Sequence, residues 1–272
     1  MRRRNSSDRN RQLITQCIVA SMCLVALMGG LTIPAGAQEL RIDTELFEDR
    51  DKEPFSENLT LFHDGTIYDF RFEPGKTRSM EEVVVFRVSP NGVGTFWLLD
   101  LDRRVKLVLS AQSLMKLVDQ VKHNEKLRAE QPQFIEPRFN EDWNPNTGRL
   151  ALSSDHITYT ATGTRTGNHS ALEAYNGFAN WYARLNAADP RKVPPFARLA
   201  LNEAMYKRGI IPEQIELTLK TGEFIESAVH IKAKHYYVWT LSKSDLSMID
   251  QVREMIASFP EIDLAGYYRL TQ

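Results

Sequence analysis

Short apolar runs separated by turn residues fill residues 40–109, and this pattern constrains the fold more than any other feature of the sequence. Asp64-Gly65 and Asn91-Gly92 stand between such runs, and these dipeptides accept the positive φ angles that tight hairpin turns require. Runs of this length and spacing are typical of antiparallel strands. We therefore expect a six-strand meander, with strands at 40–48, 58–62, 66–72, 82–88, 95–101 and 105–109.

The rest of the chain alternates between helical and strand patterns. Apolar residues in 114–121 recur at i, i+3, i+4 and i+7, which predicts a helix after Ser110. Two more helices are expected within 171–208; the second follows Pro194-Pro195, ends at Gly209 and carries Phe196, Leu199 and Met205. Further strands are expected at 133–139, 149–152, 156–161, 214–220 and 228–241, and a last helix at 246–256.

The faces of the expected strands differ across the sheet. The strands at 214–220 and 228–234 alternate apolar and polar residues, so one of their faces meets water. The strands at 82–88 and 95–101 carry apolar residues on both faces, so both faces of the central sheet must be shielded from water. Two arrangements do this: a sheet with other elements packed on both sides, or a sheet that curves over an apolar hollow. We predict an α+β fold with a large antiparallel, curved, half-barrel-like sheet and packed helices.

The N-terminal residues have the pattern of a secretory signal. Five arginines against one aspartate precede an apolar stretch at 13–33, and Ala35-Gly36-Ala37 matches the small-residue pattern before a signal-peptidase cut. We predict a signal peptide at 1–37 and a mature β-rich domain at 38–272, with a helical insertion near 171–208. Export to the periplasm or the outside of the cell follows, with membrane contact only through the signal segment. An uncleaved membrane anchor is the alternative.

Cysteine and charge narrow the function classes for the mature domain. Cys17 and Cys23 both lie in the predicted leader, so disulfide scaffolds and thiolate metal sites are excluded for residues 38–272. Loss of the leader leaves 29 basic and 34 acidic residues, a net charge of about −5. A mildly acidic domain is a poor nucleic-acid binder, so no nucleic-acid partner is expected.

The sequence has no recognisable catalytic motif, and we expect no enzyme, metal or cofactor. His230 and His235 are five residues apart on one expected strand, hence on opposite faces. Asp100 and Asp102 lie at the end of a strand, on one face, and are the one carboxylate pair that we consider as a candidate site. They either bind a cation or are simply the solvated end of the strand. Four aromatic residues of the first inserted helix suit core packing or a stacking platform: Tyr175, Phe178, Trp181 and Tyr182.

Four features together resemble exported bacterial lipoprotein carriers of the LolA-like type: the predicted signal peptide, an antiparallel meander with the Asp-Gly hairpin leading into Ile67-Tyr68-Asp69-Phe70, the run Phe96-Trp97-Leu98-Leu99-Asp100, and a helix that interrupts the sheet. The resemblance covers residues 40–161, and the helical pair at 171–208 departs from the family. The resemblance implies an unclosed barrel whose apolar cavity holds acyl chains, with a lipid or lipoprotein as partner. Phe86, Trp97 and Leu99 are the residues that we expect to line such a cavity. The alternatives are a cell-envelope structural or interaction protein with a fully packed core and, less favoured, a hydrolase.

Overall fold

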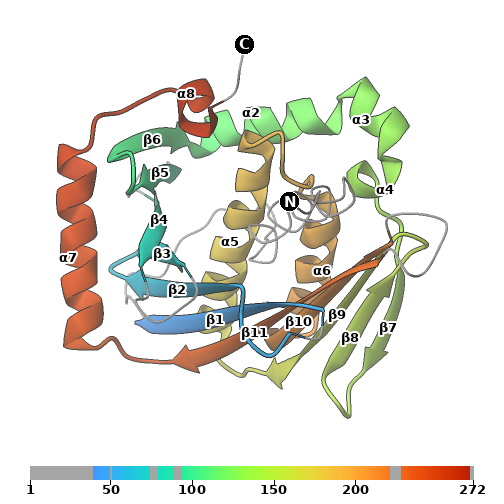
Figure 1. Ribbon diagram of the computed structural model, residues 1–272. Coiled ribbons are helices and arrows are strands. Elements are labelled where there is room, and N and C mark those ends of the chain that lie inside the picture. Colours follow the sequence, from blue (N-terminus) through green and yellow to red (C-terminus); the bar gives the residue numbers. More distant parts are fainter. Residues whose placement is uncertain (1–38, 50, 74–78, 89–93, 221–227, 270–272) are drawn as a thin grey trace, which may run out of the picture. The chain divides into compact units, whose positions relative to one another are not determined.

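The computed structural model describes residues 39–49, 51–73, 79–88, 94–220 and 228–269. Within these residues the strands form one open antiparallel sheet of eleven strands, in the order β6-β5-β4-β3-β2-β1-β11-β10-β9-β8-β7 (Figure 1). Helices accompany the sheet, which confirms the predicted α+β class with a large antiparallel sheet. The predicted signal peptide lies outside the described residues.

The bounds of the elements follow the chain. The strands are β1 (Leu40–Glu48), β2 (Ser56–His63), β3 (Thr66–Phe72), β4 (Met80–Val88), β5 (Gly94–Asp100), β6 (Val105–Ser110), β7 (Asn140–Asn144), β8 (Arg149–Ser153), β9 (Ile157–Arg165), β10 (Ile210–Lys220) and β11 (Ala228–Val238). The helices are α2 (Ala111–Lys122), α3 (Glu125–Glu130), α4 (Pro132–Ile135), α5 (His169–Leu185), the 3-10 turn η1 (Asn186–Ala188), α6 (Phe196–Lys207), α7 (Lys243–Ser258) and α8 (Leu264–Tyr268).

The chain divides into two compact units. The first unit comprises Leu46–Glu53 and Val118–Lys234, and the second comprises Pro54–Leu117 together with residues 39–45 and 235–269. Each unit has its own apolar interior.

In the second unit, hairpin turns and helix α7 organise the strands. Asp64 and Gly65 both have positive φ, at 48° and 67°, and form the two-residue turn that joins β2 to β3, as their sequence predicts. The register then places Phe70 opposite both Leu59 and Val83. This face of the strands packs against Ile249 and Val252 of α7 in one buried cluster. Burial of these apolar side chains stabilises the second unit.

In the first unit, helices α5 and α6 pack against each other and against β10. The alternating residues of β9, β10 and β11 fit this arrangement, because one set is buried and the other is at least partly exposed. The buried set contains Ile157, Tyr159, Ala161, Ile215, Leu217, Leu219, Val229, Ile231 and Ala233. The sequence predicts both helices, and Gly209 has the positive φ of 68° that the end of α6 requires.

The strand expected at 133–139 is wrong. Residues Pro132–Ile135 form the short helix α4, which follows α3, and Pro132 stands at its first turn, where proline needs no hydrogen-bond donor. The strand in this region is β7, which starts only at Asn140. Apart from the partly buried Trp143, its side chains are polar and exposed because β7 is an edge strand, so the sequence shows no apolar alternation there.

Candidate functional site

The three residues expected to line a cavity do not share one face of the sheet. Trp97 pairs with Val85 and Leu99 pairs with Val83, so Trp97 and Leu99 lie on the face that carries the α7 cluster. Phe86 pairs with Phe96 and lies on the opposite face, where the two rings stack with centroids 4.4 Å apart. Leu99 is fully buried in the α7 cluster, with Trp97 packed against it. In the second unit these residues contribute to packing.

The Asp100 carboxylate accepts two hydrogen bonds from Arg103. Its oxygens accept the backbone N–H of Arg103 at 2.9 Å and the Nε–H at 2.6 Å. Burial alone would raise the pKa of Asp100, but these hydrogen bonds and the guanidinium charge hold it below its usual value. Asp102 is exposed in the following turn. Among the described residues, no group of three or more histidine, cysteine or acidic side chains is arranged to hold a metal ion.

The histidines on β11 lie as the strand period predicts. His235 is buried and its Nδ1 lies 2.9 Å from the Thr44 hydroxyl, whereas His230 is half-buried with its Nε2 3.9 Å from Glu216. The two rings therefore point to opposite faces, and they cannot form a local metal pair.

The aromatic residues of α5 belong to the interior rather than to a surface platform. Tyr175, Phe178 and Tyr182 are buried, and the rings of Phe178 and Tyr182 lie 5.5 Å apart. Trp181 is partly exposed and lies under the guanidinium of Arg184 at 5.1 Å. Burial lowers the pKa of Arg184 to about 10.

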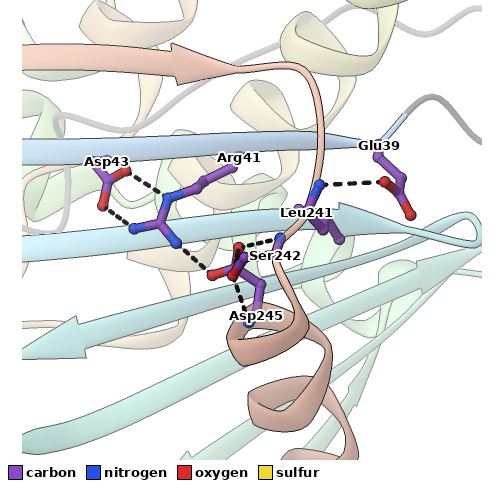
Figure 2. Close-up of polar contacts among 6 residues, drawn as sticks. All are labelled: Glu39, Arg41, Asp43, Leu241, Ser242 and Asp245. Atoms are coloured by element: carbon purple, nitrogen blue, oxygen red, sulfur yellow. Dashed lines mark hydrogen bonds and ion pairs between the residues drawn. The ribbon is translucent and has the colours of Figure 1, made fainter.

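A dense polar network in the second unit joins β1 to the start of α7 (Figure 2). The Arg41 guanidinium donates to both carboxylate oxygens of Asp43, at 2.8 and 2.7 Å, and to Asp245. Asp245 also accepts from the backbone N–H and the hydroxyl of Ser242, whose hydroxyl in turn accepts the Asp245 N–H at 3.1 Å.

Ser242 and Asp245 thereby form a capping box, which satisfies backbone donors at the first turn of α7. The hydrogen bond to Asp43 is the main reason why the pKa of Arg41 is raised, and the two carboxylates add to the effect. Glu39 completes the region by accepting the backbone N–H of Leu241 at 3.2 Å. The network holds the start of α7 in place, with the single guanidinium of Arg41 shared between the carboxylates of Asp43 and Asp245.

The interior of the first unit contains polar side chains of a different kind. Arg198 and Asn202 of α6 and Asn180 of α5, which we call the interior polar set, are buried with exposures of 0%, 1% and 0%. No hydrogen-bond partner reaches any of the three guanidinium nitrogens of Arg198 from the described residues. The side-chain amide oxygen and nitrogen of both asparagines lack a partner in the same way. Buried polar groups in proteins are almost always hydrogen-bonded, so this set is the most unusual feature of the described residues.

Helical spacing explains how these side chains come to lie inside. Arg198 and Asn202 are four residues apart and share the buried face of α6 with Leu201 and Met205. The charge of Arg198 acts on Tyr159 of β9, which belongs to the buried face of the sheet. Burial raises the pKa of Tyr159 to about 12, and Arg198 opposes that shift. Tyr159 is therefore a neutral hydroxyl at physiological pH and provides no counter-charge.

Sequence reasoning missed the interior polar set. The apolar residues expected on this helix were Phe196, Leu199 and Met205; Met205 is buried, whereas Phe196 and Leu199 are only partly buried. The sequence does contain a signal for this set. Arg198, Leu201, Asn202 and Met205 stand at i, i+3, i+4 and i+7, so the two polar residues share a helix face with two apolar ones.

No protein-family model and no curated protein sequence matches this chain. Among solved structures, the DNA polymerase sliding clamp from Pseudomonas aeruginosa aligns with 91% of this chain and 70% of its own, at 9% identity and a TM-score of 0.12. Proteins that share a fold give far higher scores, so this alignment carries no information about function. None of the helices in the described ranges is long and apolar enough to cross a membrane.

Proposed function

We propose that this protein is an exported, non-enzymatic domain that binds a lipid or another apolar ligand in the interior of its first unit. The observation that carries the proposal is the interior polar set, whose side chains are buried without hydrogen-bond partners among the described residues. A fully packed domain pairs such groups, because an unpaired buried polar group costs free energy. A bound ligand with a polar end would supply the missing partners.

The other buried side chains of the first unit favour an apolar body for this ligand. They include Leu217 and Ile231 of the sheet and Leu201 and Phe178 of the helices. Apolar walls with a few polar groups are the usual composition of small-molecule sites. This proposal keeps the LolA-like expectation of an apolar ligand but moves the site from the second unit to the first.

Native mass spectrometry of the purified mature protein, followed by solvent extraction, tests this proposal. We expect a reproducible bound mass that extraction identifies as a lipid or a similarly apolar compound. A protein that is free of bound mass and also fails to bind an apolar dye would contradict it. N-terminal sequencing of the same sample tests export, since the predicted mature chain starts at Gln38.

A cell-envelope structural protein with a fully packed core is the second candidate. The second unit favours it, because Leu99 and Val83 are fully buried in a cluster closed by α7. The same mass spectrometry separates the two candidates, since a structural protein has no ligand to retain.

A further inference from the structure

The guanidinium of Arg198 is a fully buried cation without a hydrogen-bond partner among the described residues. A guanidinium stays protonated under all physiological conditions. Burying an ion without a partner is among the most unfavourable events in a protein interior. The only other ionisable side chain among the described residues of the first unit that is both buried and charged is Asp189. Asp189 already accepts hydrogen bonds from Arg191, at 2.8 and 2.9 Å.

No other group among the described residues supplies a negative charge to Arg198. Tyr159 is protonated, as its raised pKa requires. No carboxylate or carbonyl oxygen of the described residues lies within hydrogen-bond reach of the three nitrogens of Arg198. Among the described residues, Arg198 therefore has no counter-charge, and a bound molecule could supply one.

We infer that the ligand of the proposed function carries an anionic head, a carboxylate or a phosphate monoester, that pairs with Arg198 and hydrogen-bonds to Asn202 and Asn180. This inference rests on the proposed function and adds the chemistry of the ligand head. The guanidinium presents parallel N–H groups that match two oxygens of a carboxylate or phosphate. Each asparagine adds an NH₂ donor for the remaining oxygens.

The number of charges limits the class of ligand. One buried cation matches one negative charge, and the side chains of the same α6 face, Leu201 and Met205, are apolar. A molecule with several anionic groups, such as a nucleoside triphosphate, would leave unpaired charge in an apolar site. A phosphate monoester matches one cation only as its monoanion, because it is largely a dianion at pH 7. The site is therefore suited to an amphiphile whose head carries one negative charge, such as a long-chain fatty acid or an alkyl phosphate in its monoanionic form.

Equilibrium dialysis of the delipidated protein against three radiolabelled probes tests this inference. Palmitate, hexadecyl phosphate and hexadecanol have the same chain and differ in the head. We expect the two anionic probes to bind the wild-type protein about tenfold or more tightly than hexadecanol, which is the usual worth of a charge-assisted hydrogen bond. The order of palmitate and hexadecyl phosphate distinguishes a carboxylate ligand from a phosphate ligand.

Variants at Arg198 assign the effect to this side chain. Arg198→Met is expected to lower palmitate affinity to the level of hexadecanol, without changing hexadecanol affinity. Arg198→Lys keeps the charge and loses the bidentate fork, so it should retain an intermediate preference. Lys207→Met removes a cation from an exposed position of the same helix and is expected to leave all three affinities unchanged. Circular dichroism verifies that each variant is folded, and Arg198→Lys serves alone if Arg198→Met does not fold.

The outcomes separate this inference from the proposed function. If all three probes bind equally well to the wild type and to the Arg198 variants, a ligand site exists but the anionic head is refuted. If none of the probes binds the wild type, both the anionic head and the apolar ligand are refuted. Loss of the anionic preference in Lys207→Met as well would assign the effect to net charge and would also overturn the role of Arg198.

Discussion

Replacing Arg198 with methionine is expected to stabilise the ligand-free protein while it abolishes the preference for anionic ligands. Most substitutions of a fully buried residue are destabilising, because they leave cavities or unpaired groups. Arg198 differs because its exposure is 0% and none of its guanidinium nitrogens has a hydrogen-bond partner among the described residues. Methionine is unbranched and of similar length, so it can fill the space of the aliphatic stem without the charge.

The size of the effect follows from the desolvated charge. Replacing a buried ion pair by apolar side chains of similar volume is often neutral or stabilises the protein by about 1–4 kcal/mol, and a buried charge without a partner is less favourable than a buried pair. A gain near the middle of this range, about 2.5 kcal/mol, raises Tm by about 5–10 °C for a protein of this size. Adding palmitate at about 100 times its Kd should stabilise the wild type by about 2.7 kcal/mol and Arg198→Met by much less.

Urea and thermal unfolding of delipidated protein, followed by circular dichroism, measure these quantities. Lys207→Met is the control, and its free energy of unfolding should stay within about 0.5 kcal/mol of the wild type. A clear loss of stability in ligand-free Arg198→Met would refute the reasoning, because it would mean that the guanidinium is well paired in the folded protein.

Three further predictions concern the second unit. Leu99→Ala should lower the free energy of unfolding by about 2–5 kcal/mol in urea titrations, since Leu99 is fully buried in the α7 cluster; a cost below about 1 kcal/mol would instead fit a residue that lines an open cavity. Asp245→Ala should lower the free energy of unfolding by about 1–3 kcal/mol, because it removes half of the capping box and an acceptor for Arg41. The control Asp250→Ala, on the exposed side of α7, should change it by no more than about 0.5 kcal/mol. Equal effects of the two variants would show that the network contributes nothing. Because the pKa of Asp100 is lowered in the folded protein, its stabilisation is present above its unfolded pKa of about 4 and is lost as the pH falls through the folded pKa. The stability difference between wild type and Asp100→Asn, measured in urea at pH values from about 6 to about 2, should therefore shrink toward acid, and a constant difference would contradict the depressed pKa.

Local chemistry made much of the fold predictable. The Asp64-Gly65 turn needs positive φ at both residues, and few sequences other than Asp-Gly or Asn-Gly allow it. The helix pair of the first unit was marked by Pro194-Pro195 before α6 and Gly209 after it. The edge strand β7 was not predictable in the same way, because an edge strand needs no apolar face and its side chains follow no alternation.

The candidate site could not be predicted from the hydrophobic pattern of the sequence, because the packing of α6 buries residues that by themselves prefer solvent. A pattern read by hydrophobicity places arginine and asparagine in solvent, because these residues are rarely fully buried. Arg198 and Asn202 are buried nonetheless, since α6 packs with this face inward. Positions where a sequence contradicts its own burial pattern are where functional sites are expected.

An experimental structure of the protein with bound palmitate or hexadecyl phosphate tests the central claim most directly. We predict density for an acyl chain among the buried side chains of the first unit. The head should have its oxygens within hydrogen-bond distance of the Arg198 guanidinium and of the Asn202 and Asn180 amides. A structure in which Arg198 pairs with a carboxylate of the protein itself, with no ligand in this interior, would contradict the claim.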